Sequence, residues 1–182
     1  MASQRLRMLG AMAEAVAAKG YARTSVADVL GRAGVSRETF YEQFSSKEDC
    51  FLATFDRAAE ILLERLTHMA GAATEADRFE RLVAAYLDTI AGEPAHARIY
   101  LVEAPAVGPE AVRRRAAIQG RFTDALAGLL GAREPHERFA CEVLVAAVGA
   151  MVSTRLALGE HESLRDLREP IVDLISRARP DM

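Results

Sequence analysis

Apolar side chains recur every three to four residues from the start of the chain, the spacing that one face of an α-helix requires. In the first segment this stripe consists of Leu6, Leu9, Ala13, Val16 and Ala17. Gly20 follows and supplies the left-handed conformation at which helices commonly end. The same pattern, broken by Gly or Pro, predicts later helices over about 75–91, 94–103, 109–130, 134–158 and 163–178. No strand pattern competes, so the chain is predicted to be all-α with about nine helices.

Two short helices are predicted directly after the first. Ser25 and Asp28 have the spacing of a capping box, so a helix starts there and ends at Gly34. Ser36 caps the next helix, about two turns long, whose buried face is formed by Phe40 and Phe44. Short helices joined by about three residues that include a glycine have the sequence form of a helix-turn-helix.

The outer face of the second short helix carries the candidate chemistry. At 100° per residue, Tyr41 points away from the buried pair, as do Glu38, Thr39 and Glu42. Tyr41 has no core to enter, so its ring is expected to pack on another molecule, such as a DNA phosphate or a thymine methyl group. The alternatives without DNA binding are an ordinary helical hairpin for the pair of short helices and a surface tyrosine for Tyr41.

A longer helix is predicted from Ser45-Ser46 to about Met69. Its first turn holds two acids, Glu48 and Asp49, which the helix dipole favours there. Its apolar stripe consists of Phe51, Phe55, Leu62 and Leu66.

Charge is unevenly distributed along the chain. The chain has a net charge of -3, but residues 1–47 hold seven Lys or Arg against four Asp or Glu, a local charge of +3. Residues 48–182 hold sixteen against twenty-two, a charge of -6. Hydrophobic residues make up 51% of the chain and aromatic residues 6%, with Ala, Leu and Val in excess, which favours helices. Residues 1–47 are therefore expected to face a polyanion, and the surface of the remaining residues is expected to face solvent.

Neither metal nor redox chemistry is predicted. Cys50 and Cys141 lie far apart without a CxxC pair, and each is expected to be a buried, small apolar side chain. The histidines form no i, i+4 pair, so no metal and no cofactor are expected; they are His68, His96, His136 and His161. The longest apolar run, Val143–Val152, is about half a membrane span, which favours a cytoplasmic protein without a membrane role.

The run GYARTSVADVLGRAGVSRETFYEQFSSKED, which begins at Gly20, resembles the N-terminal module of the TetR family of bacterial transcriptional regulators. The likeness covers residues 5 to about 55, with AGVS, TFY and F-x-x-K-E in fixed register. It implies that Thr24 and Ser25 hold the backbone at the start of the second helix. It also implies that Thr39 and Tyr41 contact phosphates or base edges and that Lys47 binds phosphate. A helix start already favours an anion at Lys47.

Base reading is assigned to two residues by their chemistry. Arg37 can pair with guanine and Gln43 with adenine, which makes them the candidates, next to the capping Ser36. Glu38 departs from the small residue usual in the family, and its bulk opposes close approach of the backbone. A carboxylate can also accept from cytosine N4, so Glu38 or Glu42 could specify a base rather than only repel phosphate.

The rear of the chain is expected to dimerise, since a module of about 50 residues reads few base pairs. The predicted interface is the apolar run with small residues for close helix approach, namely Val143, Ala146, Gly149, Ala150 and Ser153. The alternative is the central helix of a monomer. Candidate residues for an apolar cavity are Phe55, Phe79, Tyr86, Tyr100, Glu103, Gln119 and Phe122, with core packing as the alternative for each. That such a region binds an inducer is implied by the resemblance.

The sequence therefore predicts a helix-turn-helix DNA-binding domain over residues 1–48 and a helical ligand-binding and dimerisation domain over 49–182. The expected function is a homodimeric repressor that binds a palindromic double-stranded DNA operator and is released by a small-molecule effector. A helical small-molecule binding protein or enzyme without DNA binding, and a purely structural dimer, are the alternatives. No nucleophile with a neighbouring base, phosphate loop or metal set supports an enzyme.

Overall fold

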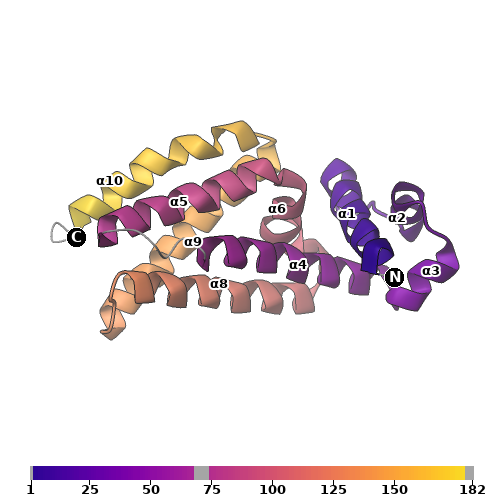
Figure 1. The fold of residues 1–182 in the computed structure, drawn as a ribbon, viewed down its shortest axis with the longest axis horizontal. Helices are drawn as coiled ribbons and strands as arrows, with labels where there is room; N and C mark the ends of the chain where they lie inside the picture. Colours follow the sequence, from indigo (N-terminus) through magenta and orange to yellow (C-terminus); the bar gives the residue numbers. More distant parts are fainter. Residues whose placement is uncertain (1, 68–73, 179–182) are drawn as a thin grey trace. The chain divides into compact units, whose positions relative to one another are not determined.

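The computed structural model describes residues 2–67 and 74–178, and every regular element in that part of the chain is helical (Figure 1). The first four helices are α1 (Ala2–Lys19), α2 (Val26–Ala33), α3 (Arg37–Gln43) and α4 (Lys47–Thr67). They are followed by α5 (Glu75–Gly92), α6 (Pro94–Leu101), α7 (Ala104–Val107), α8 (Pro109–Leu129), α9 (Pro135–Leu158), the 3₁₀ helix η1 (His161–Leu167) and α10 (Arg168–Ala178). The all-α prediction is confirmed.

Two predicted helices differ from the observed ones. The helix expected over 94–103 ends at Leu101, and the separate short helix α7 follows because Pro105 falls in its first turn. The helix expected over 163–178 starts as η1, whose bonds follow a tighter pattern, and becomes α-helical only at Arg168. The predicted end of the fourth helix near Met69, and His68, lie outside the described residues.

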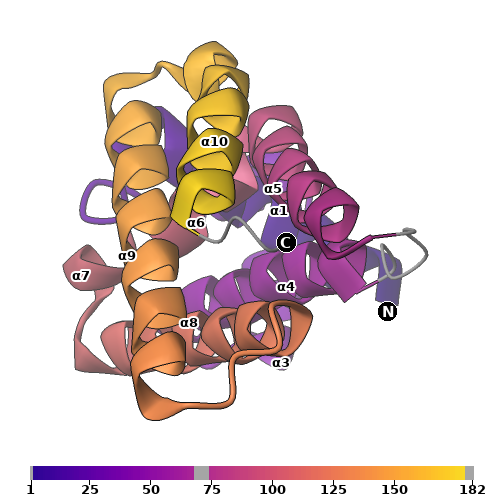
Figure 2. The ribbon, with the colours of Figure 1, turned by 90° about the vertical axis from the view of Figure 1, so that its left-hand side faces the viewer.

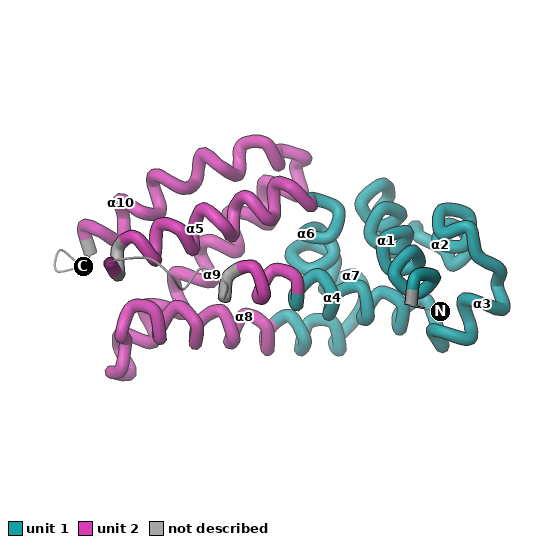
Figure 3. The backbone as a smooth tube through the Cα atoms, in the orientation of Figure 1, with its two compact units in different colours: residues 1–60, 94–115 teal, residues 61–93, 116–182 magenta. Residues whose placement is uncertain are grey.

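The chain divides into two compact units, which Figure 3 colours separately. Unit 1 comprises residues 1–60 and 94–115, so it holds α1 to α3, most of α4, α6, α7 and the start of α8. Unit 2 comprises residues 61–93 and 116–182. This division follows packing and does not test the functional boundary predicted at residue 48, which stays a prediction.

Unit 1 is built on an aromatic and methionine core. Its largest fully buried side chains are Phe40, Phe44, Phe51, Phe55, Met8 and Met12. The Phe40 and Phe44 rings lie 5.5 Å apart, as their i, i+4 spacing on α3 requires. The inner face of α3 is thereby fixed against the unit, which leaves its opposite face for another molecule.

Unit 2 is a packed set of long helices. In Figures 1 and 2, α10 runs along α5, and η1 connects it to α9. Leu87, Ile90 and Leu164 are almost completely buried at these contacts. Two surface ion pairs tie the same elements together, Arg165–Asp88 at 2.7 Å and Arg168–Glu80 at 3.0 Å.

Candidate DNA-binding interface

The turn between α2 and α3 has the geometry that its sequence predicts. Gly34 has φ +61° and ψ 44°, a left-handed conformation in which its N–H donates to the Leu30 carbonyl over 3.0 Å. The N–H of Val35 donates to the same carbonyl over 3.3 Å, which closes the end of α2. Ser36 then begins α3 in an extended conformation. A left-handed residue at this position strongly favours glycine.

Both helices of the pair are capped from within. Ser25 Oγ accepts from the Asp28 N–H at 3.3 Å, and Asp28 Oδ2 accepts from the Ser25 N–H at 2.7 Å, so the predicted capping box is present. At α3, Ser36 Oγ accepts from the Thr39 N–H at 3.1 Å, and the two hydroxyls lie 2.9 Å apart. The Ser36 and Thr39 hydroxyls are therefore engaged with each other before any DNA arrives.

Two arginines on α1 cap the opposite helix ends, a role that the sequence pattern did not indicate. Arg7 Nε donates to the carbonyl of Ala33, the last residue of α2, at 3.2 Å. Arg5 Nη1 donates to the carbonyl of Gln43, the last residue of α3, at 3.1 Å, and its guanidinium lies 4.4 Å from the Phe44 ring centre. The last carbonyls of a helix lack internal partners and attract cations. Together Arg5 and Arg7 fix both helices to α1.

The outer face of α3 is polar and open. Arg37, Glu38, Tyr41 and Glu42 are exposed, and Thr39 and Gln43 are half-buried. Tyr41 is 46% exposed although its neighbour Phe40 is fully buried. The Arg37 guanidinium lies 5.6 Å from the Tyr41 ring centre, so a cation and an aromatic hydroxyl project together from one side of the helix. This arrangement suits an anionic surface with hydrogen-bonding groups.

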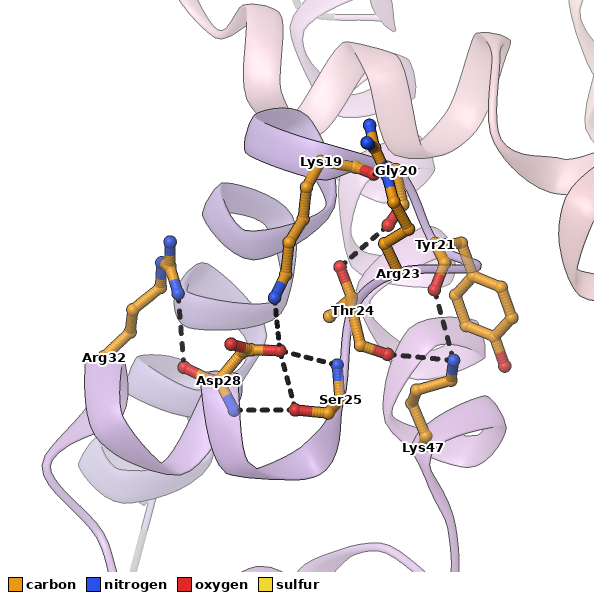
Figure 4. Close-up of polar contacts among 9 residues, drawn as sticks. All are labelled: Lys19, Gly20, Tyr21, Arg23, Thr24, Ser25, Asp28, Arg32 and Lys47. Atoms are coloured by element: carbon orange, nitrogen blue, oxygen red, sulfur yellow. Dashed lines mark hydrogen bonds and ion pairs between the residues drawn. The ribbon is translucent and has the colours of Figure 1, made fainter.

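Lys47, the first residue of α4, uses part of its hydrogen-bonding capacity within the protein (Figure 4). Its ammonium donates to the carbonyls of Tyr21 at 3.1 Å and Thr24 at 3.0 Å. It also lies 3.9 Å from the Tyr21 ring centre. An ammonium has three N–H donors, so one remains for a phosphate. Lys47 is therefore a structural residue of the turn before α2 as well as a candidate phosphate contact.

Thr24 and Ser25 take the backbone-holding positions that the resemblance implies. Thr24 is 2% exposed, and its Oγ1 donates to the Gly20 carbonyl at 2.9 Å, so the side chain itself does not face solvent. Asp28, the partner of Ser25, also pairs with Lys19 at 2.7 Å. The hydrogen bond from Lys19, with those from Ser25, lowers the pKa of the Asp28 carboxyl well below its usual range. The capping box therefore stays ionised at every physiological pH.

Comparison with known proteins agrees with this geometry. Residues 9–54 match the family model of the bacterial regulatory proteins of the tetR family. Residues 9–54 therefore resemble the N-terminal DNA-binding domain of that family. The chain is a DNA-binding transcriptional regulator, as the sequence predicts. No curated protein sequence matches it.

Solved structures extend the likeness in fold over almost the whole length of the chain. The fatty acid degradation regulator FadR from Bacillus halodurans matches with a TM-score of 0.83 at 19% identity, over 94% of this chain and 93% of that one. FadR from Bacillus subtilis in complex with stearoyl-CoA gives 0.78 at 18% identity, over 93% and 96%. A TetR-family regulator from Streptomyces coelicolor gives 0.75 at 20%, over 98% and 96%. At these identities the likeness is one of fold, and all three matched proteins are named as regulators.

The apolar helix α9 has one exposed side in the single chain. Within the apolar run Val143–Val152 only Val152 is buried in the single chain, so this run is not the fully buried central helix of a monomer. Of the predicted interface residues, Val143, Ala146 and Ala150 are exposed, and Gly149 and Ser153 are half-buried. Sequence reasoning missed the two ends of this surface, Phe139 at 64% and Leu158 at 67% exposure.

These positions form one continuous surface, which we call the α9 face: Phe139, Val143, Ala146, Ala147, Ala150, Met151, Thr154 and Leu158. Their spacing of three, four and seven residues places them on one side of the helix. Exposed apolar surfaces of this kind are typical of interaction sites. By length and composition alone α9 could cross a bilayer, a weak criterion that core helices of soluble proteins also meet.

The seven candidate cavity residues fall into both units. In unit 1, Phe55 and Tyr100 are buried with ring centres 5.5 Å apart, and burial raises the pKa of Tyr100 to about 12. In unit 2, the rings of Tyr86 and Phe122 meet edge to face at 6.2 Å. Phe79 is buried and Gln119 is half-buried in the same unit. Ligand binding by these residues stays a prediction.

The seventh candidate, Glu103, has partners inside unit 1. Its carboxylate accepts from the Tyr21 N–H at 3.0 Å and from Arg98 Nε at 3.0 Å.

Both cysteines are free and buried, and burial raises the pKa of the Cys50 thiol to about 12. Within residues 2–67 and 74–178, no group of three or more His, Cys, Asp or Glu side chains could hold a metal ion.

Proposed function

We propose that this chain acts in the cytoplasm as a homodimeric repressor, which binds a palindromic DNA operator through α3 and is released by a small-molecule effector. The observation that carries the proposal is the outer face of α3. Arg37 and Tyr41 project from it, and its two ends are held by the N-cap Ser36 and by Arg5. Arg7 and the N-cap Ser25 hold the ends of α2 in the same way. A rigid helix with a free guanidinium suits the major groove, where arginine pairs with guanine.

Specific contacts within this proposal fall into two classes. Arg37 and Gln43 read bases, because Arg can pair with guanine and Gln with adenine; Arg37 is exposed, and Gln43 is half-buried about 1.7 turns further along α3. Tyr41, Thr39 and Lys47 contact phosphates and set the register. Phosphate contacts position a protein on the duplex, and base contacts select the sequence.

Dimerisation is assigned to the α9 face. A single recognition helix reads too few base pairs for a useful operator, so a second copy is needed. The small side chains Ala146, Ala147 and Ala150 allow close approach of a second helix, and Phe139 and Leu158 add apolar area at both ends. Burial of this face against a partner removes the largest exposed apolar side chains of α9 from water.

The effector is assigned to the class of mostly apolar small molecules. The predicted cavity residues are mainly aromatic, and FadR from Bacillus subtilis, which shares this fold, was solved in complex with stearoyl-CoA. Stearoyl-CoA is therefore the first probe. The chain has no tryptophan, so release is followed by the fluorescence anisotropy of a labelled operator duplex rather than by protein emission.

Selection from random DNA duplexes by the purified protein tests the proposal. We expect enrichment of a palindrome whose half-sites lie about one helical turn, 34–36 Å, apart. The matched control is the double variant Arg37→Ala and Tyr41→Ala, which leaves the buried Phe40 and Phe44 in place and should enrich no sequence. Enrichment of no palindrome by the wild-type protein refutes the repressor assignment.

A further inference from the structure

Glu103 is a buried carboxylate between α6 and α7 whose side chain is turned away from its own helix. It occupies the N-cap position of α7, yet it makes no side-chain hydrogen bond to that helix. Its side chain is 8% exposed and forms an ion pair with Arg98 on α6. Its other oxygen, Oε2, accepts from the backbone N–H of Tyr21 at 3.0 Å, a contact that bridges 82 residues of sequence.

Tyr21 connects this carboxylate to the DNA-binding helices. Its carbonyl accepts from the Lys47 ammonium at 3.1 Å, and its ring lies 5.0 Å from that of Phe51, edge to face. Lys47 also bonds the Thr24 carbonyl, immediately before α2. The peptide groups of Tyr21 are therefore held on one side by α4 and on the other by Glu103.

Gly20 makes the approach of Glu103 possible. It ends α1 with φ +79°, a conformation that turns the Tyr21 N–H toward the carboxylate. A Cβ atom at Gly20 would lie 3.7 Å from Glu103 Oε2, an ordinary van der Waals distance, so the positive φ and not a lack of space favours glycine here. The residues of this connection therefore come from the turn after α1, from α4, and from α6 and its junction with α7, all within unit 1.

We propose that Glu103 is a positioning residue that determines which half-site spacing the protein accepts. This inference rests on the proposed dimeric repressor. A carboxylate that accepts from both Arg98 and the Tyr21 amide fixes the angle between the DNA-binding helices and α6. One extra base pair moves a half-site by about 3.4 Å and rotates it by about 34°, so only a stiff joint rejects the wrong spacing.

The contacts of α2 and α3 with α1 do not depend on Glu103. Arg5 and Arg7 fix the ends of the two helices, and the capping box of Ser25 holds the start of α2. Loss of the Glu103 contact should therefore leave each recognition helix competent for one half-site. Binding of two half-sites at once should weaken, because a looser joint loses more conformational freedom when both helices dock.

The experiment compares Glu103→Ala, Glu103→Gln and wild type on three duplexes: the selected palindrome, the same palindrome with one added central base pair, and a single half-site. Glu103→Gln keeps an amide oxygen that accepts from Tyr21. For Glu103→Ala we expect about a tenfold loss on the palindrome, equivalent to about 1.4 kcal/mol, with unchanged half-site affinity. Its preference for the correct spacing should shrink, and Glu103→Gln should restore most of that preference.

Ile99→Val is the matched structural control, because it removes one methyl group from fully buried Ile99 on α6 and leaves Arg98 and Glu103 in place. It should keep the wild-type spacing preference. A wild-type spacing profile in Glu103→Ala, or an equal loss of preference in Ile99→Val, overturns the inference and leaves the repressor assignment intact. If wild type selects no palindrome, the repressor assignment fails and the inference falls with it.

Discussion

Replacement of Lys47 by methionine separates the structural role of this side chain from its proposed role as a phosphate contact. Methionine keeps much of the aliphatic length and removes the ammonium. In the free protein the substitution removes hydrogen bonds to the Tyr21 and Thr24 carbonyls, at 3.1 and 3.0 Å, and a cation–π contact at 3.9 Å. On DNA it removes one candidate phosphate contact. The loss of the intramolecular contacts lowers stability whether or not DNA is bound. The loss of the phosphate contact changes how operator affinity depends on salt concentration.

The magnitude of each loss follows from these contacts. A hydrogen bond to a charged group contributes about 1.5–3 kcal/mol and a cation–π contact about 0.5–2 kcal/mol. Because Lys47 is only half-buried, the low end applies, and we expect Lys47→Met to lower the free energy of unfolding by about 2 kcal/mol. The slope of the logarithm of operator affinity against the logarithm of salt concentration should become shallower by about 0.9, the value for one phosphate.

Urea denaturation and operator binding between low and physiological salt provide the two measurements. Lys19→Met is the control, because it removes the other lysine of the chain, whose charge is already paired with Asp28. It should change the salt slope less than Lys47→Met does. Unchanged stability in Lys47→Met would refute the structural role, and an unchanged salt slope would refute the phosphate contact.

Three further outcomes are expected. Arg37→Ala should weaken operator binding by about 1–3 kcal/mol and relax one base position, as measured by repeated selection; equal losses on all sequences would contradict base reading. Val143→Glu should give a monomer in sedimentation at micromolar concentration, whereas Leu6→Glu, at an equally exposed apolar position on α1, should not; a Val143→Glu dimer would exclude the α9 face. Because burial raises the pKa of Cys50 to about 12 and Cys141 is buried, Ellman's reagent should label neither thiol in native protein at pH 8 and both in urea; rapid native labelling would contradict the packing.

Local chemistry explains why the DNA-binding helices were predictable from the sequence. The capping box of Ser25 and Asp28, the left-handed Gly34 and the N-cap Ser36 each act within about four residues, so the sequence alone carries their signal. Their predicted positions are confirmed. The spacing of Phe40 and Phe44 likewise fixed which face of α3 is buried.

Contacts between distant residues were not predictable in the same way. Arg5 and Arg7 bond carbonyls 38 and 26 residues away, and Glu103 bonds an amide 82 residues away. A backbone acceptor carries no residue type, so no pattern of side chains marks such a pair. Glu103 was assigned to a cavity because an isolated acid in an apolar segment suggests a ligand contact, and its observed partners offer a structural reason for the same residue.

Most basic side chains in the N-terminal part of the chain donate hydrogen bonds to the protein's own backbone carbonyls. Among the described residues of the DNA-binding helices, those that donate to carbonyls are Arg5, Arg7, Arg23, Arg32 and Lys47, and Lys19 pairs with Asp28. Among the described basic residues there, Arg37 is the one whose guanidinium makes no hydrogen bond within the protein, and the exposed Glu38 and Glu42 lie on the same helix. Carbonyl partners leave the charge itself in place, so attraction to DNA persists at long range. In the proposed complex, close contact would bring the two carboxylates toward the duplex. We therefore expect selection for a sequence that pairs with Arg37 and either offers cytosine N4 donors to the glutamates or keeps phosphates away from them.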